Sequence, residues 1–567
     1  MAQELLDFCV EKGMLLDKSV LNLLSGMENQ EFAKKLIEVI EFKYKQKIIT
    51  KSFFLSNPAR VRELLNSYDS EMRKILDSFF INLGVNLDIL ELSGISTREF
   101  SKEELVEKET SEENVNLLKI YQNPAKKIEV GDFVNSFRNR YGVIKSILQK
   151  RTELENLTSI NRIDEGKSFS IIGMIYDKKT TKNDNVLLEV EDLTGKITAL
   201  VNKNRLEVYE KSKEVILDEI VGLKCSGSRE MVFVNDIIFP DARIFEKKKS
   251  KIEEIAAFTS DTHVGSNKFL EKNFLKFIDW LNGKVGDEKQ KAEAMKVRYL
   301  FITGDTVDGV GVYPGQDKEL SIQDVNKQYE KLTELLLMIR SDIKIILCPG
   351  QHDAVRVAEP QPLIGEFYGT MIRDIPNLYL VTNPALVEIG SGRDSGNKFK
   401  ILMYHGASMH GIINSIDKLR LNKAHDHPTE VVKYMLKKRH LAPSHSLTTY
   451  TPYSEDPLLI TDIPDIFATG DLHRPEVGDY NGVLLIASSC WQSITPFEEK
   501  VGNSPDPCKV PIFNLKTREI KMLDFSDACD EDESDEIFEG ESKNGVKPCE
   551  KIVEATGESK LEVKNAN

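Results

Sequence analysis

The sequence of 567 residues is poor in the features that mark secreted and membrane proteins. Its seven cysteines are scattered, form no Cys-x-x-Cys pair and are odd in number, which argues against a disulfide framework and a cysteine-rich zinc site. No apolar run approaches the roughly 20 residues that cross a bilayer. The first residues, MAQELLDFCVEKG, lack a basic stretch followed by an apolar core. We therefore expect a soluble, cytoplasmic protein that does not bind membranes.

Motifs for nucleotide-driven chemistry are also absent. The sequence contains no Walker A loop, no dinucleotide-binding glycine motif and no polymerase-like carboxylate signature. Histidine does not occur in the first 262 residues or in the last 94, so all nine histidines lie between His263 and His473. Surface histidines without a shared role would be spread more evenly. This concentration indicates one region that carries the chemistry.

That region contains five short polar motifs, each at the end of an apolar run. The runs are IAAFTS, YLFIT, IKIILCP, KILMY and DIFAT, which we interpret as buried strands. Helical patterns over 273–281 and 322–340 separate the first three, so each motif is expected at the carboxyl end of a strand, where an open α/β sheet places its ligands. The motifs are Asp261-Thr-His263, Gly304-Asp305-Thr-Val-Asp308, Gly350-Gln351-His352-Asp353, Tyr404-His405-Gly406 and Gly470-Asp471-Leu-His473.

Imidazole and carboxylate groups in this order predict a two-metal phosphoesterase centre. Two divalent ions about 3.5–4 Å apart can activate a water and neutralise the developing charge on a phosphate, with one carboxylate between them. Mixed nitrogen and oxygen donors suit Mn, Fe, Zn or Mg. Each motif alone has an ordinary explanation as a turn, a helix cap or a buried polar residue. Five motifs together favour the metal site.

On these motifs, residues 255–525 resemble the calcineurin-like metallophosphoesterase superfamily, whose pattern is DxH, GDxxD, GNHD/E, H and GHxH. The resemblance implies that His352 acts on the phosphate as an acid or transition-state stabiliser and that Asp353 orients it by a hydrogen bond. Asp308 is expected to shape its loop. The implied metal ligands are Asp261, His263 and His473 for the first ion, Asp305 as the bridge, and Gln351, His405 and Asp471 for the second ion.

Two of these positions depart from the superfamily pattern. Gln351 stands where the family has a metal-binding Asn, and Asp471 stands where it has the first His of the last motif. Both can still coordinate through oxygen, and the added oxygen character predicts Mn²⁺ or Mg²⁺ as the two divalent cofactors. The other histidines match no ligand position and are interpreted as structural. They are His410, His425, His427, His440 and His445.

A narrower resemblance joins the segments GDTVDGVGVYPGQ, PGQHDAVR and KKRHLAP, which are similar to the small subunit of archaeal D-family DNA polymerase. It implies a 3′–5′ exonuclease that proofreads primer ends, with DNA and a large catalytic subunit as partners in a heterodimer. One alternative is a catalytically decayed scaffold that stabilises the large subunit. Another is a phosphomonoesterase or cyclic-nucleotide enzyme, which the upstream β-domain argues against.

The sequence predicts a protein of mixed α/β class that is divided into five segments. Five short apolar strands between 168 and 239 predict a small OB-type barrel, an all-β accessory domain. The first hundred residues carry leucines at helical spacing. The predicted segments are a helical domain over 1–93, a flexible linker over 94–124, an OB-fold domain over 125–248, a calcineurin-like αββα sandwich over 249–525, and a disordered acidic tail over 526–567.

Most of the net charge of −15 belongs to the carboxyl-terminal segment. Residues 524–567 contain 14 acidic residues and five lysines, a net of −9, which leaves −6 for the rest. Affinity for nucleic acid comes largely from neutralised phosphates. A mildly acidic body therefore predicts weak DNA binding by the chain alone and a larger partner that supplies the grip.

Overall fold

The computed structural model describes residues 115–121, 127–164, 168–365, 367–392, 397–501, 503–526, 549–553 and 563–564, with scattered positions between 5 and 49. The chain separates into two compact units, 1–111 and 112–567. In the first unit, helix α2 (Lys18–Ser25) is described, and strand β1 (Leu15–Leu16) pairs in parallel with β2 (Ile48–Ile49). Most of the helical domain predicted over 1–93 lies outside the described residues.

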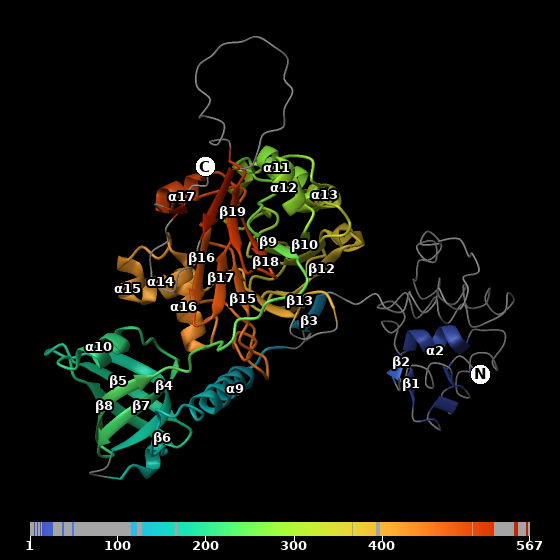
Figure 1. Cartoon of the computed structure of the whole chain (residues 1–567). Helices are drawn as coiled ribbons and strands as arrows, with labels where there is room; N and C mark the ends of the chain where they lie inside the picture. Colours follow the sequence, from blue (N-terminus) through green and yellow to red (C-terminus); the bar gives the residue numbers. More distant parts are fainter. Residues whose placement is uncertain are drawn as a thin grey trace. The chain divides into compact units, whose positions relative to one another are not determined.

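The second unit begins with a short strand and then a helix and a barrel (Figure 1). Five strands close in the order β4-β5-β6-β8-β7, with β6 and β8 parallel. Alternate residues such as Leu188 and Val190 point inward and are fully buried, as the period of two in the sequence requires. The predicted small barrel is confirmed. Its elements are α9 (Val130–Leu148), β4 (Ser168–Thr180), β5 (Val186–Asp192), β6 (Gly195–Val201), α10 (Leu206–Lys213), β7 (Ile220–Gly227) and β8 (Met231–Ile238).

The domain that follows, here called the two-sheet domain, is built from two sheets that pack face to face. One sheet has the order β12-β11-β10-β9-β18-β19-β20-β21 and the other the order β16-β17-β15-β14-β13-β3. Apolar side chains from both sheets, among them Phe258, Phe301 and Ile466, share one fully buried core. The strands of the first sheet are β9 (Ile255–Thr259), β10 (Val297–Thr303), β11 (Lys344–Cys348), β12 (Leu378–Leu380), β18 (Lys509–Asn514), β19 (Ile520–Asp524), β20 (Cys549–Val553) and β21 (Val563–Lys564).

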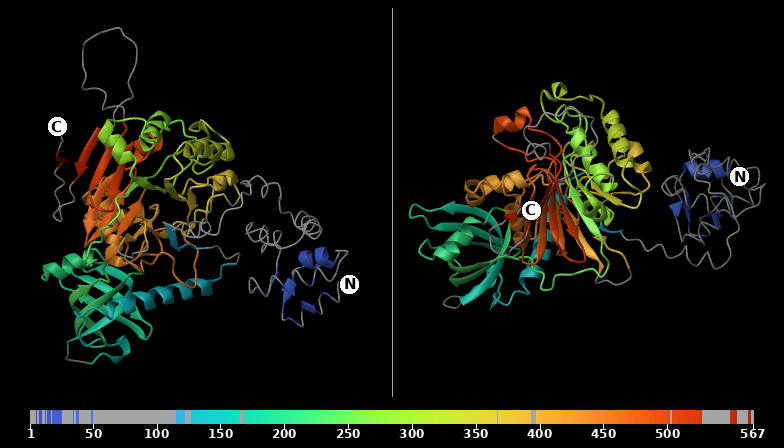
Figure 2. Two further views of the ribbon diagram at one scale, coloured as in Figure 1. Left: turned by 45° about the vertical axis from the view of Figure 1, so that its right-hand side comes forward. Right: turned by 45° about the horizontal axis from the view of Figure 1, so that its top comes forward.

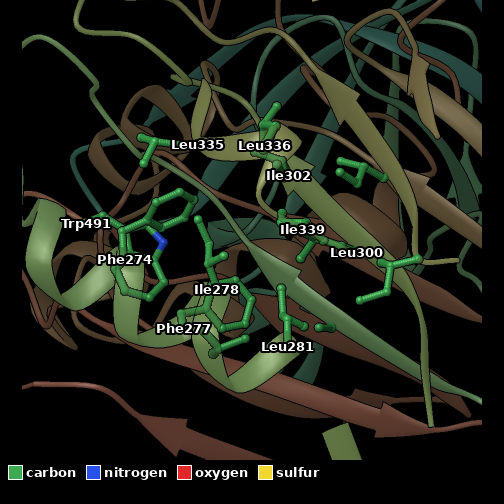
Figure 3. Close-up of a cluster of buried hydrophobic side chains, with 14 of the residues drawn as sticks. Phe274, Phe277, Ile278, Leu281, Leu300, Ile302, Leu335, Leu336, Ile339 and Trp491 are labelled. Carbon is green, nitrogen blue, oxygen red and sulfur yellow. The ribbon is translucent and has the colours of Figure 1, made fainter. Parts of the chain in front are cut away.

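The second sheet contains β3 (Val115–Lys119), β13 (Ala385–Ile389), β14 (Phe399–Met403), β15 (Ile466–Thr469), β16 (Glu476–Tyr480) and β17 (Val483–Ala487). Helices cover the outer faces of the two sheets (Figures 1 and 2). Apolar residues of the helices α11 and α13 pack on the first sheet around Trp491 (Figure 3), and those of α14 and α16 pack on the second. The helices are α11 (Glu271–Leu281), α12 (Glu288–Ala294), α13 (Val325–Leu337), α14 (Met409–Ser415), α15 (Asp417–Leu421), α16 (Pro428–Lys438) and α17 (Pro496–Val501).

Two of the predicted segments need correction. The linker predicted over 94–124 contains β3, which pairs antiparallel with β13 at the edge of a sheet. Val115 of this strand is buried, although the polar residues around it in the sequence predict a linker. The tail predicted to be disordered over 526–567 contains β20 and β21, and β20 pairs with β19. Residues 527–548, 554–562 and 565–567 lie outside the described residues.

Buried ion pairs join the barrel and α9 to the two-sheet domain. Lys438 of α16 lies 2.6 Å from Glu219, and both side chains are 2% exposed. Arg140 of α9 lies 2.7 Å from Asp456, which also contacts His440 at 3.0 Å. Among the described residues, helices long and apolar enough to cross a membrane are absent.

Candidate metal centre

Loops that follow parallel strands bring the five motifs together. β9, β10 and β11 are parallel neighbours in the first sheet, and β14 and β15 are parallel neighbours in the second. The carboxyl ends of neighbouring parallel strands meet at one edge. The loops after these strands therefore carry all seven predicted metal ligands into a common cluster.

Five of the seven predicted ligands have left-handed backbone conformations, which are uncommon for residues other than glycine. Strain of this kind costs roughly 1–3 kcal/mol per residue and persists where a site demands it. The loops also approach one another so closely that only glycine fits at position 350, because a Cβ on Gly350 would lie 2.2 Å from Asp305 Oδ1. The φ angles are 51° at Asp261, 47° at His263, 47° at Asp305, 69° at Asp471 and 54° at His473.

The first group of ligands is Asp261, His263 and His473, which are all buried. Asp261 Oδ1 lies 3.3 Å from His473 Nε2 and 3.9 Å from His263 Nε2. The two Nε2 atoms are 3.3 Å apart. Two nitrogens and a carboxylate oxygen thus converge on one point, as a cation site requires.

Carboxylates outside this group fix the orientation of its two imidazoles. His263 Nδ1 donates to Asp308 Oδ1 at 3.1 Å, and His473 Nδ1 donates to Glu498 Oε1 at 2.8 Å. Each ring therefore directs its Nε2 to the common point, which is the orientation of metal-bound histidines. Asp308 also accepts hydrogen bonds from Gln316 and Gln492. Glu498 was not found from the sequence, since it belongs to none of the five motifs.

The second group is Asp305, His405, Asp471 and Gln351. His405 Nε2 lies 3.2 Å from Asp305 Oδ2 and 3.8 Å from Asp471 Oδ1. His405 Nδ1 donates a hydrogen bond to the carbonyl of Thr303 at 2.7 Å. The Nε2 atom of the ring is therefore the one that can coordinate a metal ion. Gln351 donates through Nε2 to Asp471 Oδ1 at 3.1 Å. The two residues that depart from the superfamily pattern therefore contact each other.

Four buried polar atoms of these groups have no hydrogen-bond partner within the described part of the chain. They are Asp261 Oδ1, Gln351 Oε1, His405 Nε2 and Asp471 Oδ2. Buried polar atoms are normally satisfied, and an unsatisfied one costs about 1–3 kcal/mol. All four belong to predicted ligands and are the atom types that bind Mn²⁺ or Mg²⁺. The donor set therefore fits two divalent cations, with Asp305 placed between the two groups.

His352 and Asp353 lie beside the centre but do not form the predicted pair. His352 Nδ1 donates to the carbonyl of Asp308 at 2.8 Å. Asp353 is buried and accepts from the Gly350 amide at 2.8 Å, from Thr306 and from Tyr329. The prediction that Asp353 orients His352 is therefore wrong. Its carboxylate accepts hydrogen bonds from the backbone amides of Thr306 and Gly350, which lie in two of the loops that carry predicted ligands. A motif match does not predict these contacts.

Opposing effects set the charge of the central carboxylate. Burial alone would raise the pKa of Asp305, but nearby His405, His352 and His263 lower it well below its ordinary value. Burial raises the pKa of Asp353, and the negative charge of Asp305 adds to that rise. Asp305 is thus an ionised carboxylate of the centre, and His473 and His405 lower the pKa of Asp261 against the effect of its burial as well.

A cavity of about 880 Å³ opens over the two groups. His263, Asp305, Gln351, His352, Asp471 and His473 line it, together with residues that no motif contained. His410 is one of these, and its Nε2 lies 3.5 Å from Asp471 Oδ2, so it stands beside a predicted ligand. His440 does have a structural setting, buried against Asp456.

The chain is similar to curated archaeal proteins over most of its length. A family model that describes the B subunits of DNA polymerases alpha and epsilon matches residues 256–478. The DNA polymerase II small subunit of Methanothermobacter thermautotrophicus is 38% identical over 400 residues, which cover 70% of this chain and 80% of that protein. The one from Archaeoglobus fulgidus is 37% identical, covering 69% and 77%. The one from Pyrococcus furiosus is 35% identical, covering 71% and 65%.

Proposed function

The chain belongs to the archaeal DNA polymerase II small subunit family, and from this membership and the site we propose that it is a metal-dependent 3′–5′ exonuclease. The substrate is a DNA 3′ end, and the products are a nucleotide and a shortened strand. The name of the family implies a large subunit, so the working enzyme is a heterodimer in which this chain proofreads. The resemblance to D-family small subunits expected from the sequence is confirmed.

The observation that carries the nuclease proposal is the set of four unpartnered buried ligand atoms. Among the described residues, none of these four atoms makes a hydrogen bond: Asp261 Oδ1, Gln351 Oε1, His405 Nε2 and Asp471 Oδ2. A protein that had lost its metals would gain stability by pairing or replacing such groups. Their retention supports a site that still binds cations.

The residues around the cluster have distinct parts in the reaction. When bound, the two divalent ions would supply Lewis-acid activation of a water and of the phosphodiester. The Asp308 carbonyl fixes the proton of His352 on Nδ1, so Nε2 is the atom that can exchange a proton with a substrate oxygen in the cavity. Asp308 and Glu498 hold two ligand rings in place.

The scaffold alternative rests on one contact. The hydrogen bond from Gln351 to Asp471 at 3.1 Å already satisfies one atom of each residue, which weakens the second group as a metal site. A scaffold would keep this contact and bind at most one ion. Metal content therefore separates the two functions: the nuclease proposal expects two divalent ions per chain in the Mn²⁺-loaded heterodimer.

A substrate panel tests the proposal directly. Mismatched primer ends, matched primer ends, single strands and small phosphate esters would be incubated with the heterodimer in Mn²⁺ and in excess chelator. We expect Mn²⁺-dependent release of nucleotides from 3′ ends, fastest at mismatches and single strands. Hydrolysis confined to phosphomonoesters or cyclic nucleotides would favour a phosphomonoesterase or cyclic-nucleotide enzyme. If none of the substrates is hydrolysed, the scaffold is favoured.

A further inference from the structure

One side of the cavity is formed by a single segment that follows the His405 motif. α14, α15 and the loop after α15 contribute His410, Asn414, Arg420, Lys423 and His425 to its lining. These five residues are called the basic wall. The lining also contains five carboxylates, Asp305, Asp308, Asp426, Asp471 and Glu498. Asp426 lies in the same segment as the wall and pairs with Arg474 at 2.9 Å. The lysine and the arginine of the lining therefore both stand on this segment, whereas four of the five carboxylates lie outside it.

Lys423 is the cation of the wall whose charge has no partner among the described residues. Within the described ranges, the ammonium group of Lys423 makes neither an ion pair nor a hydrogen bond. Its backbone is held at φ 52°, in a turn closed by the bond from the Ala424 amide to the Leu419 carbonyl at 2.9 Å. Ala424 is 1% exposed, so a buried anchor follows the lysine. The fold thus places Lys423 at the cavity without using its charge.

The second cation is held only weakly. Arg420 forms an ion pair with Asp417 of the same short helix, and the two side chains are 57% and 76% exposed. Exposed pairs of this kind contribute about 0–1 kcal/mol. The guanidinium can therefore exchange this partner for a phosphate, with which it forms stronger, paired hydrogen bonds.

The histidines connect the wall to the candidate metal centre. His410 Nε2 lies 3.5 Å from Asp471 Oδ2, and its ring centroid lies 5.2 Å from that of His425. Side chains thus extend without interruption from a predicted ligand of the second ion to the loop that carries Lys423. A polymer with a phosphate at the centre would reach the wall with its neighbouring phosphates.

We propose that the basic wall binds the sugar–phosphate backbone of single-stranded DNA next to the scissile phosphate, with Lys423 and Arg420 as the phosphate contacts. The inference rests on the proposed nuclease function and adds to it where the substrate strand lies. Contacts to phosphates position a strand without reading its bases. The wall therefore explains how one cavity accepts every 3′ end irrespective of sequence.

The test measures binding and catalysis separately. Binding of a short single strand, labelled at its 5′ end, is followed by fluorescence anisotropy in heterodimers that carry Asp305→Asn, so that no digestion occurs. Lys423→Gln is compared with Lys418→Gln, which removes the same charge from α15 at a residue outside the cavity lining. Lys423→Arg restores the charge.

We expect Lys423→Gln to weaken binding about fivefold and to reduce the slope of log affinity against log salt by about 1. Lys418→Gln should stay within about twofold, and Lys423→Arg should recover most of the affinity. In the heterodimer with Asp305 intact, Lys418→Gln should leave Mn²⁺-dependent hydrolysis of bis(p-nitrophenyl) phosphate unchanged, because Lys418 lies outside the cavity lining.

Three results would overturn the inference: unchanged DNA affinity in Lys423→Gln, an equal loss in Lys418→Gln, or a loss of heterodimer assembly with DNA affinity per heterodimer unchanged. The last would make the wall a protein interface. Absence of diester hydrolysis in the heterodimer with Asp305 intact would count against the nuclease proposal alone, because the anisotropy arm does not depend on turnover.

Discussion

At the scale of single residues, the centre depends on side chains that hold the ligands as much as on the ligands themselves. The strand-end motifs predicted which seven residues converge, because a buried strand followed by Asp, His or Gln determines where the side chain emerges. The partners of those residues could not be predicted. Glu498 lies 25 positions after His473, and its role arises only from tertiary packing against that ring.

Glu498→Gln tests this positioning role. The carboxylate of Glu498 orients His473 by a hydrogen bond and raises the basicity of its ring. The substitution keeps the shape of the side chain but weakens this hydrogen bond. We expect the Mn²⁺ concentration for half-maximal activity to rise about 10- to 100-fold, with much of the maximal rate recovered at saturating Mn²⁺. Glu499→Gln, at the exposed neighbouring position, is the matched control. Equal metal dependence in both variants would contradict the role.

Asp471→His tests the identity of the second group. The change restores the histidine of the superfamily pattern and replaces an anionic oxygen by a neutral nitrogen, which softer ions prefer. We expect Mn²⁺ or Mg²⁺ to support the wild-type heterodimer best and Zn²⁺ poorly, and the variant to shift toward Zn²⁺ while remaining active. Initial rates against metal identity measure this. An unchanged ranking of metals would show that Asp471 is not a ligand.

At the scale of elements, the pattern of apolar residues in the sequence predicted the central strands of the sheets but not their edge strands. The buried strands around Phe258, Phe301 and Phe467 are continuous apolar runs, as parallel strands covered on both faces must be. β3 is different, because its sequence VNLLK follows a long polar stretch and its partner β13 lies about 270 residues away. Pairing at that separation leaves no local signal.

A buried histidine predicts how the contact between α9 and the two-sheet domain responds to pH. Burial and the charge of Arg140 lower the pKa of His440 to about 4, against the opposing effect of Asp456. In the unfolded chain this imidazole takes up a proton near pH 6.5, whereas in the folded chain it stays neutral down to about pH 4. The stability that the neutral His440 contributes to the folded state is therefore complete above pH 6.5. It is lost as the pH falls toward 4, by about 3 kcal/mol in total.

His440→Gln removes that titration and should flatten the dependence of the urea midpoint on pH between 6.5 and 4. His427→Gln, at a histidine that is 60% exposed, is the control and should keep the wild-type slope. The measurement is the unfolding midpoint of each variant across this pH range. A wild-type slope in His440→Gln would mean that other groups, such as Asp456, carry the acid sensitivity.

At the scale of the whole molecule, the net charge predicts that the chain alone binds DNA weakly. The chain carries a net charge of −15, and its cavity presents carboxylates to a polyanion. We expect the isolated chain to bind a primer end weakly and to digest it slowly at physiological salt, and the large subunit to raise both. Titration of labelled DNA with the chain and with the heterodimer measures this. Tight binding by the chain alone would contradict it.

The proposal that the clustered ligands perform metal-dependent exonucleolysis is tested most directly by Asp305→Asn in the heterodimer. Asp305 lies between both groups and is an ionised carboxylate of the centre, so its loss should abolish 3′–5′ exonuclease activity. The expected decrease is several orders of magnitude, with assembly unchanged and metal content reduced. An exonuclease rate within about tenfold of wild type, a difference of only about 1.4 kcal/mol, would show that the activity does not depend on this centre.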